Sequence, residues 1–159
     1  MSTAMTPNRT AQTLALFIPL ALIAGALTSQ YGFGLFPCEM CMWQRWPHYT
    51  AILLAALSFI VAPARTPLVV LATLAIAVSG AIGAFHAGVE YGWWEGFTQC
   101  TSNLGGEGSA LDRIMNAPVI RCDVAPWDLF GVSLAGWNAI FSLGGALVIA
   151  ILLLKGRKT

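Results

Sequence analysis

Four cysteines are the residues of this chain that are best suited to chemistry. Cys38 and Cys41 form the sequence Cys-Glu-Met-Cys, and Cys100 and Cys122 follow later in the chain. A two-residue spacing permits a reversible disulfide between thiols of unequal pKa, and the thiolate is the reactive form of such a pair. Arg45 follows Cys41 by one helical turn, where a cation favours the thiolate. The spacing therefore indicates thiol–disulfide exchange.

Two other interpretations of these cysteines stay open at this point. Glu39, between the first two cysteines, raises their thiol pKa and so opposes redox work, which leaves a structural disulfide as one alternative. The other alternative is a zinc site that the second cysteine pair would complete. Four cysteines allow three disulfide pairings, and nearness in the sequence favours Cys38 with Cys41 and Cys100 with Cys122.

The composition is that of an integral membrane protein. Of the 159 residues, 57% are hydrophobic and only 9% are charged, whereas about a quarter of an ordinary globular protein is charged. The near balance of 8 Lys and Arg against 7 Asp and Glu also excludes nucleic acid as a partner, because phosphate binding needs clustered basic residues.

Four apolar stretches are expected to position the cysteines. A helix needs about 20 apolar residues to cross a bilayer, and the stretches that approach this length are 13–29, 46–62, 67–88 and 129–154. They predict an all-α membrane protein, a bundle of four transmembrane helices in which 1–159 is a single domain. The remaining segments are an outer loop with the CxxC pair at 30–45, a cytoplasmic turn at 63–66, a second outer loop at 89–128 and a basic tail at 155–159.

Basic residues predict the orientation of the bundle, because Lys and Arg beside a span tend to stay cytoplasmic. One side carries five basic residues and the other three, namely Arg9, Arg65, Lys155, Arg157 and Lys158 against Arg45, Arg113 and Arg121. Both termini are therefore expected in the cytoplasm and the cysteines outside. An aromatic belt is expected at the outer ends of the spans, from Trp43, Trp46, Trp93, Trp94 and Trp127. Trp137 is the exception, since it lies inside the fourth stretch.

A cleaved secretory signal is an alternative for the first stretch. Arg9, the apolar run and the small residues Ala24, Gly25 and Ala26 also resemble such a signal with its cleavage site. Three spans would then remain, and both cysteine loops would still face outward.

The second outer loop combines a flexible segment with a helical pattern. Gly105, Gly106 and Gly108 supply flexibility, and Leu111, Ile114 and Met115 then recur at helical spacing until Pro118. This pattern predicts a short amphipathic helix on the membrane surface. An ordinary loop braced by one disulfide is the alternative.

These features together resemble the disulfide bond formation protein B (DsbB) family, inner-membrane quinone reductases that recharge a periplasmic dithiol oxidase. The resemblance covers nearly the whole chain. Its carriers are Cys38-Glu-Met-Cys41 followed by Trp-Gln-Arg45, then Phe85-His86, Cys100 after an aromatic-rich stretch, and Cys122 with Trp127-Asp128.

The resemblance implies a role for each cysteine. Cys38 and Cys41 match the pair that passes electrons to a quinone, with Cys41 lying against the quinone ring. Cys100 matches the cysteine that forms a mixed disulfide with the soluble oxidase, and Cys122 matches its partner.

The resemblance also implies a quinone site. Arg45 matches an arginine that contacts the quinone, and His86 matches a histidine near the same ring. Because Arg45 stays protonated, it would stabilise negative charge on a quinone oxygen, although it could instead merely anchor the membrane interface.

The implied activity is that of a quinone-dependent protein-disulfide oxidoreductase. Its cofactor is ubiquinone or menaquinone, its partner is a periplasmic dithiol oxidase of thioredoxin fold (DsbA-like), and its location is the bacterial inner membrane. No metal is implied.

Two rival functions remain. A structural four-helix membrane protein with two inert disulfides would show no quinone dependence, and a metal-binding membrane protein would release zinc to chelators. A reductase of the vitamin K epoxide type also has four helices, but there the quinone-facing CxxC is expected late in the chain.

Overall fold

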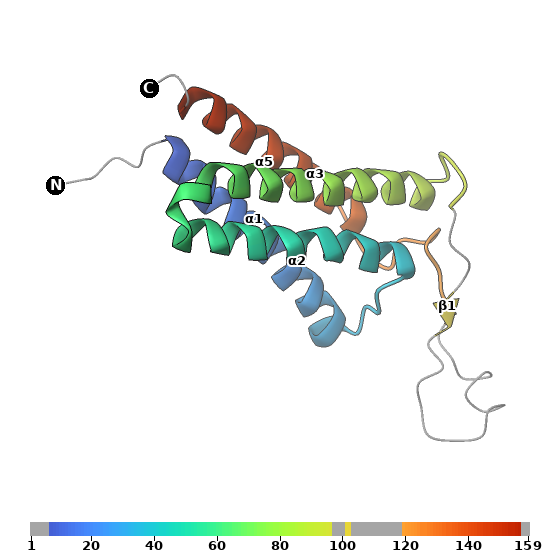
Figure 1. Cartoon of the computed structure of the whole chain (residues 1–159). Helices are drawn as coiled ribbons and strands as arrows, with labels where there is room; N and C mark the ends of the chain where they lie inside the picture. Colours follow the sequence, from blue (N-terminus) through green and yellow to red (C-terminus); the bar gives the residue numbers. More distant parts are fainter. Residues whose placement is uncertain (1–6, 97–100, 103–118, 157–159) are drawn as a thin grey trace.

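Four long helices dominate the computed structural model, which describes residues 7–96, 101–102 and 119–156 (Figure 1). They are α1 (Pro7–Phe33), α2 (Glu39–Ile60), α3 (Arg65–Glu90) and α5 (Leu134–Gly156), with a short 3-10 turn, η1 (Ala62–Ala64), between α2 and α3. Both termini lie at the same end of the bundle. The expected all-α arrangement of four helices is confirmed.

Three of the helical segments are long and apolar enough to cross a membrane, namely Asn8–Phe33, Ala62–Glu90 and Leu134–Gly156. Helix α2 is not among them, so a fourth span is not confirmed. The first half of α2 contains the polar residues Gln44, Arg45 and His48 among apolar ones, whereas its second half is mainly apolar. The first half carries the residues of the candidate site.

The helices pack as a closed ring, in which α2 lies on α3, α3 on α5, α5 on α1 and α1 on α2. Small side chains allow this approach, as is common between membrane helices. The buried apolar cluster consists of Ala11, Ala15, Ala51, Ala55, Val69, Ala72, Ile76, Ala146, Ile149 and Leu153. Gly83 of α3 is a further point of close approach, since a Cβ there would lie 2.9 Å from Nδ2 of Asn138.

Two short hairpins complete the described structure beyond α3. Strand β1 (Thr101–Ser102) pairs antiparallel with β2 (Val119–Ile120), and β3 (Asp128–Leu129) pairs with β4 (Val132–Ser133). The turn of the second hairpin has Phe130 and Gly131 at positive φ, 55° and 76°.

Two helix boundaries differ from the sequence-based expectation. Helix α5 begins at Leu134 rather than near Leu129, because the β3–β4 hairpin occupies the residues before it. Helix α2 begins at Glu39 rather than at Trp46, where the expected apolar stretch starts, and Cys38 caps its first turn. The amphipathic helix expected around Leu111 to Met115 lies outside the described residues.

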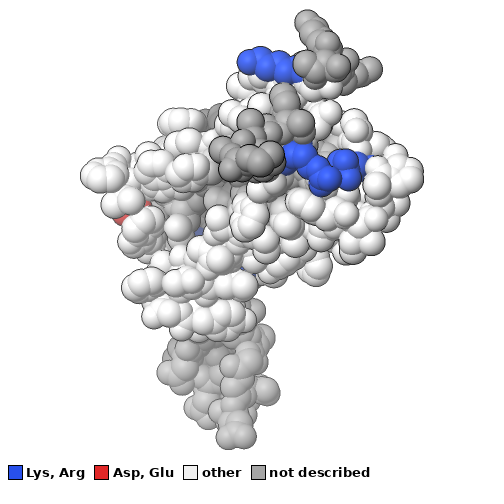
Figure 2. All heavy atoms as spheres, turned by 90° about the vertical axis from the view of Figure 1, so that its left-hand side faces the viewer, with Lys and Arg blue, Asp and Glu red and all other residues white. Residues whose placement is uncertain are grey.

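Basic side chains gather on the end face that carries the termini, where little Asp or Glu is visible (Figure 2). Arg9 lies in the first turn of α1, Arg65 opens α3, and Lys155 lies in the last turn of α5. The opposite end carries exposed aromatic side chains, Trp43, Trp46, Trp93, Trp94 and Trp127. The basic residues that predict the cytoplasmic side thus lie at one end of the bundle and the tryptophans at the other. The orientation across the membrane stays a prediction.

Candidate functional site

Cys38 and Cys41 meet at the first turn of α2. Cys38 is the N-cap residue, and its sulfur accepts a hydrogen bond from the backbone N–H of Cys41 at 3.2 Å. The two Sγ atoms lie 2.9 Å apart, with Cys38 as the donor. Both thiols are free in the structure, so the expected disulfide between them stays a prediction. The helix start nevertheless holds the two sulfurs next to each other.

The two thiols differ in acidity because the thiol of Cys38 donates a hydrogen bond to the sulfur of Cys41. The hydrogen bond from Cys38 holds the pKa of Cys41 below its ordinary value, and the positive charge of Arg45 acts in the same direction. Burial and the negative charge of Glu90 oppose this effect. The hydrogen bond to Cys41 and burial raise the pKa of Cys38. In the reduced pair, Cys41 is therefore the more acidic thiol and Cys38 the less acidic one.

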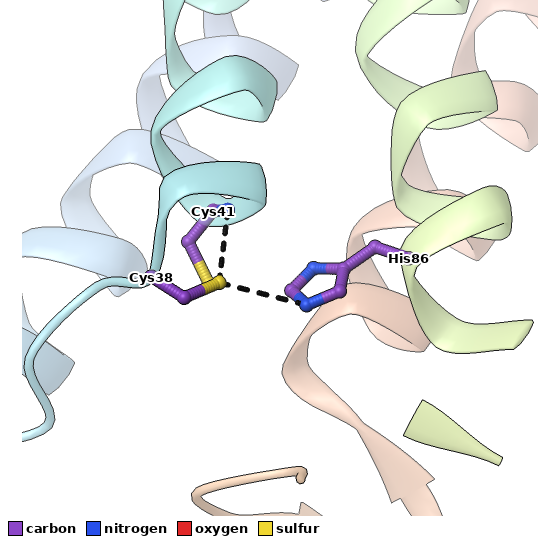
Figure 3. A group of neighbouring side chains, drawn as sticks. All are labelled: Cys38, Cys41 and His86. Atoms are coloured by element: carbon purple, nitrogen blue, oxygen red, sulfur yellow. Dashed lines mark hydrogen bonds between the residues drawn. The ribbon is translucent and has the colours of Figure 1, made fainter. Parts of the chain in front are cut away.

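His86 points from α3 at the sulfur of Cys38 (Figure 3). Its side chain is buried, and Nε2 lies 3.6 Å from Sγ of Cys38 and 3.7 Å from Oε1 of Glu90. Its other ring nitrogen, Nδ1, lies 2.8 Å from Nε2 of Gln44. The histidine thus bridges the thiol pair and a polar group inside the bundle.

The surroundings of Gln44 fix the tautomer of His86. Nε2 of Gln44 also donates to the carbonyl oxygen of Met40 at 3.2 Å, and Oε1 accepts from Nδ2 of Asn138 at 2.8 Å. The amide nitrogen therefore faces His86 as a donor, which makes Nδ1 an acceptor. The hydrogen of the neutral imidazole is then on Nε2, the ring nitrogen that lies near Sγ of Cys38 and Oε1 of Glu90.

The hydrogen-bonded side chains around Gln44 continue across the bundle. Nδ2 of Asn138 also donates to Oγ of Ser79 at 3.2 Å, and Oδ1 of Asn138 lies 2.9 Å from Nε2 of His48. Ser142 donates to Oδ1 of Asn138 at 2.9 Å. A hydrogen-bonded chain thus links His86 on α3 to His48 on α2 through side chains of α2 and α5.

A first cavity of about 220 Å³ lies between α1, α2 and α5. Cys41 and Arg45 line it from α2. Arg45 is only 8% exposed and donates from Nη1 to Oε1 of Gln30 at 2.6 Å and from Nη2 to the carbonyl oxygen of Ala26 at 3.3 Å. A fixed cation thus stands beside the more acidic thiol in a largely apolar pocket.

A second cavity, of about 300 Å³, opens on the other side of the thiol pair. Cys38, His86 and Glu90 line it, and Arg121 lies at its edge, as does Cys41. His86 and Arg45, which the resemblance placed at one quinone ring, thus line different cavities. Cys41 borders both.

The second pair of cysteines is described in part. Cys122 is buried and packs in one cluster with Cys38, Met40 and Val89. A hydrogen bond to Cys122 contributes to raising the pKa of Cys38. Cys100 lies outside the described residues, so its expected disulfide with Cys122 stays a prediction. Cys122, which is distant in the sequence, therefore lies with Cys38 and Cys41 at the start of α2.

Cys38, Cys41 and His86 offer ligand atoms that lie within 4.8 Å of one another, as a metal ion would need. A metal would bind the unprotonated ring nitrogen of histidine, whereas the polar group around Gln44 places the hydrogen of His86 on that atom. Binding through Nε2 would require the Gln44 amide to turn over and to lose its bond from Asn138.

Sequence reasoning missed several residues of this site. Gln44, His48, Ser79, Glu90 and Asn138 had no assigned role, although all take part in the contacts around the two cavities. One signal was available, since Gln44 and His48 are one turn apart on one helix and Asn138 and Ser142 are one turn apart on another. Polar residues at that spacing inside apolar helices indicate facing partners.

Comparison with known proteins gives a consistent result. The family model of the disulfide bond formation protein DsbB matches residues 8–152. A disulfide bond formation protein B of Actinobacillus pleuropneumoniae serotype 5b (strain L20) is 53% identical over 38 residues, which is 24% of this chain and 21% of that protein. An uncharacterized protein of Rickettsia prowazekii (strain Madrid E) is 21% identical over 131 residues, 79% of this chain and 76% of that protein. No solved structure matches significantly.

Proposed function

The chain belongs to the DsbB family of disulfide bond formation proteins, and from this premise we propose that it reoxidises a soluble dithiol oxidase and passes the electrons to a membrane quinone. Family membership gives the coarser conclusion, a disulfide-forming oxidoreductase of the membrane. The observation that supports the finer proposal is the position of Cys41, the more acidic thiol of the pair, which borders a cavity beside a buried arginine.

Electrons enter at Cys100 and Cys122 in this proposal. A thiolate of the partner attacks Cys100, and the released Cys122 thiolate attacks Cys38, because each exchange proceeds through a mixed disulfide. The packing of Cys122 in one cluster with Cys38 supports the second step. Cys41 then leaves as a thiolate, which the positive charge of Arg45 stabilises.

The first cavity has the properties that a quinone ring needs. At about 220 Å³ it exceeds the ~150 Å³ apolar cavity that holds benzene in an engineered protein. When bound, a quinone would accept two electrons and two protons. Arg45 provides a fixed positive charge where negative charge develops, which is worth more in an apolar pocket than in water. Cys41 supplies the sulfur nearest to that pocket.

His86 acts on the thiols in this scheme rather than on the quinone. The partner's second thiol releases Cys100, which attacks Cys122 of the Cys38–Cys122 disulfide and re-forms Cys100–Cys122, so that Cys38 is the leaving sulfur. Nε2–H of His86 lies 3.6 Å from that sulfur. A hydrogen bond to a charged group is stronger than one between neutral groups. His86 therefore stabilises the Cys38 thiolate.

The overall exchange balances. The partner's two thiols lose two electrons and two protons and become a disulfide. The quinone gains these two electrons and two protons and becomes a quinol, while Cys38–Cys41 and Cys100–Cys122 return to disulfides. The partner is a periplasmic thioredoxin-fold (DsbA-like) oxidase, and ubiquinone or menaquinone is the acceptor.

The proposed location is the bacterial inner membrane, with both termini in the cytoplasm. The basic end face at the termini supports this orientation, since basic residues favour the cytoplasmic side (Figure 2). The thiol pair, at the opposite end of the bundle, then faces the oxidising periplasm, where disulfides persist.

The test is reduction of a short-chain ubiquinone by the purified full-length protein, with a reduced dithiol oxidase as electron donor. We expect one quinol for each partner disulfide formed. Cys41→Ser should abolish quinol formation, and the matched Trp46→Phe, exposed and outside the first cavity, should leave it unchanged. Partner oxidation that continues at full rate beyond the equivalents held in the protein's own disulfides, without quinone and under anaerobic conditions, would refute the proposal.

A further inference from the structure

The reduced thiol pair and its neighbouring histidine supply three of the four ligands of a tetrahedral zinc site (Figure 3). Zinc binds cysteine thiolates and neutral histidine nitrogens, with Zn–S and Zn–N bonds of about 2.3 and 2.0 Å. At a tetrahedral angle these bonds place sulfur and nitrogen about 3.5 Å apart. Nε2 of His86 lies 3.6 Å from Sγ of Cys38. The positions of these side chains therefore suit a zinc ion.

The second cavity leads to these ligand atoms. Cys38, Cys41 and His86 all line it. A fourth ligand is available there as water or as Glu90, whose Oε1 lies 3.7 Å from Nε2 of His86. The two sulfurs would separate from 2.9 Å to about 3.8 Å when both bind the ion, which is a small side-chain movement. The arrangement of the side chains alone thus does not keep zinc from the reduced pair.

The tautomer of His86 is what opposes the ion. Zinc needs the lone pair of Nε2, whereas Gln44 donates to Nδ1 at 2.8 Å and so leaves the hydrogen on Nε2. Turning the Gln44 amide over would break two further bonds, because its nitrogen donates to the carbonyl oxygen of Met40 and its oxygen accepts from Asn138. Nδ2 of Asn138 is itself oriented by the carbonyl oxygen of Ser79 at 3.3 Å, which can only accept.

We propose that Gln44 is a positioning residue that excludes zinc from the reduced thiol pair by fixing the tautomer of His86. Asn138 acts with Gln44 by holding its amide in one orientation. A disulfide-forming oxidoreductase must remove two electrons from this pair in each cycle, and an ion bound to both thiolates would keep the pair reduced. The inference concerns the reduced pair alone and does not depend on which acceptor takes the electrons.

The test reverses the hydrogen bond at Nδ1 of His86. In Gln44→Glu the carboxylate can only accept, so it takes the hydrogen bond of an Nδ1–H group, still accepts from Asn138, and leaves Nε2 with its lone pair. Partners in this position change metal affinity by about 10–100-fold. We therefore expect Gln44→Glu to bind Zn²⁺ about 10–100-fold more tightly than the parent protein. Competition with a chromophoric chelator measures both affinities at one fixed pH, since thiolate ligands make them depend on pH.

The parent protein for this test is the full-length chain with Cys100→Ser and Cys122→Ser, kept reduced under anaerobic conditions. Cys38 and Cys41 are then its only thiols. A parallel titration uses Co²⁺ in place of Zn²⁺, because the sulfur charge-transfer and d–d absorption bands of Co²⁺ report thiolate ligands and tetrahedral geometry.

Two further variants assign the gain in affinity to the histidine. Adding His86→Phe to Gln44→Glu should cancel the gain, because it removes the nitrogen ligand. Gln12→Glu is the matched control, since Gln12 is another buried helical glutamine, bonded to Ser58 and outside both cavities. It should leave metal affinity unchanged.

The tautomer itself can be measured without relying on a variant that folds. The chain has two histidines, and the NMR shifts of their ring nitrogens distinguish protonated from unprotonated atoms. We expect His86 to carry its hydrogen on Nε2 in the parent protein and on Nδ1 in Gln44→Glu. His48, which donates from Nε2 to Asn138, should be the same in both.

The inference is overturned if the parent protein binds Zn²⁺ as tightly as folded Gln44→Glu, or if adding His86→Phe leaves the gain in place. It is also overturned if His86 of the parent protein carries its hydrogen on Nδ1. A wild-type protein that fails to reduce quinone would overturn the proposed function and leave this inference standing.

Discussion

Cys38 and Cys41 share a sulfur–sulfur contact of 2.9 Å, yet only Cys41 borders the first cavity. Cys38 faces His86 and the cluster that contains Cys122. One turn of helix therefore presents Cys38 to Cys122, from which the electrons are proposed to arrive, and Cys41 to the first cavity, into which they are proposed to leave.

The reduced pair should be alkylated first at Cys41. Its pKa is lowered by the hydrogen bond from Cys38, so its thiolate persists as the pH falls below the ordinary thiol range, whereas Cys38 stays protonated because its pKa is raised. Rates of iodoacetamide labelling at each cysteine, followed by mass spectrometry from pH 5 to 9, measure this order. Equal labelling of both cysteines across that range would contradict it.

Arg45→Gln and Glu90→Gln should shift the pKa of Cys41 in opposite directions. Removing the cation raises that pKa, because the charge of Arg45 stabilises the thiolate, and removing the carboxylate lowers it. The pH midpoint of Cys41 alkylation measures both shifts. Arg45→Gln should also weaken quinone use by about 1–3 kcal/mol if a charge-assisted hydrogen bond is lost. Arg9→Gln, in the first turn of α1 at the opposite end of the bundle, is the control.

His86→Phe should slow exchange at Cys38 without changing quinone affinity. The substitution removes the Nε2–H that lies 3.6 Å from Sγ of Cys38, and loss of a hydrogen bond to a charged sulfur corresponds to about a tenfold slower step. Rapid mixing with reduced partner measures this step, and His86→Gln, which keeps an N–H donor, should restore part of the rate. If His86→Phe raised the quinone Kd and left thiol–disulfide exchange at Cys38 at its normal rate, His86 would instead act at the quinone ring.

Gly83→Ala should destabilise the bundle. An added Cβ would lie 2.9 Å from Nδ2 of Asn138 and 3.0 Å from the carbonyl oxygen of Ala135, and crowding of this kind costs about 1–3 kcal/mol. Gly144→Ala is the matched control, because a Cβ there meets nothing within 4 Å. Thermal unfolding in detergent should show a lower Tm for the first variant only.

A partner that lacks its resolving cysteine should accumulate as a covalent adduct at Cys100 in Cys122→Ser. Cys100 is then a free thiol, so it first attacks the Cys38–Cys41 disulfide, and the partner's thiolate attacks Cys100 in the resulting mixed disulfide and returns Cys38 and Cys41 to thiols. Without Cys122 the loop has no sulfur to displace the partner, so the adduct at Cys100 persists. Non-reducing peptide mapping identifies the linked cysteine. An adduct found only at Cys38 or Cys41 would reverse the proposed electron path.

The sequence was sufficient for the family, for the four helices and for the position of the CxxC pair, because apolar length and cysteine spacing are local properties. It was insufficient for the polar chain between His86 and His48. Gln44 and Asn138 are 94 positions apart, and only the packing of α2 and α5 on α3 brings their amides together. The division of Arg45 and His86 between two cavities likewise depends on tertiary packing.

Tyr91 at the end of α3 ties down the chain that carries Cys122. Its hydroxyl donates to the carbonyl oxygen of Gly131 at 3.2 Å and accepts from the N–H of Ser133 at 3.0 Å, which anchors the β3–β4 hairpin. Asp128 opens that hairpin six positions after Cys122, a tether that spans at most about 20 Å. So short a tether keeps the effective concentration of the Cys122 thiol near Cys38 in the millimolar range or above, on the order expected for short linkers. Exchange between the two loops is then a first-order event, whose rate does not depend on how densely the membrane is populated with this protein.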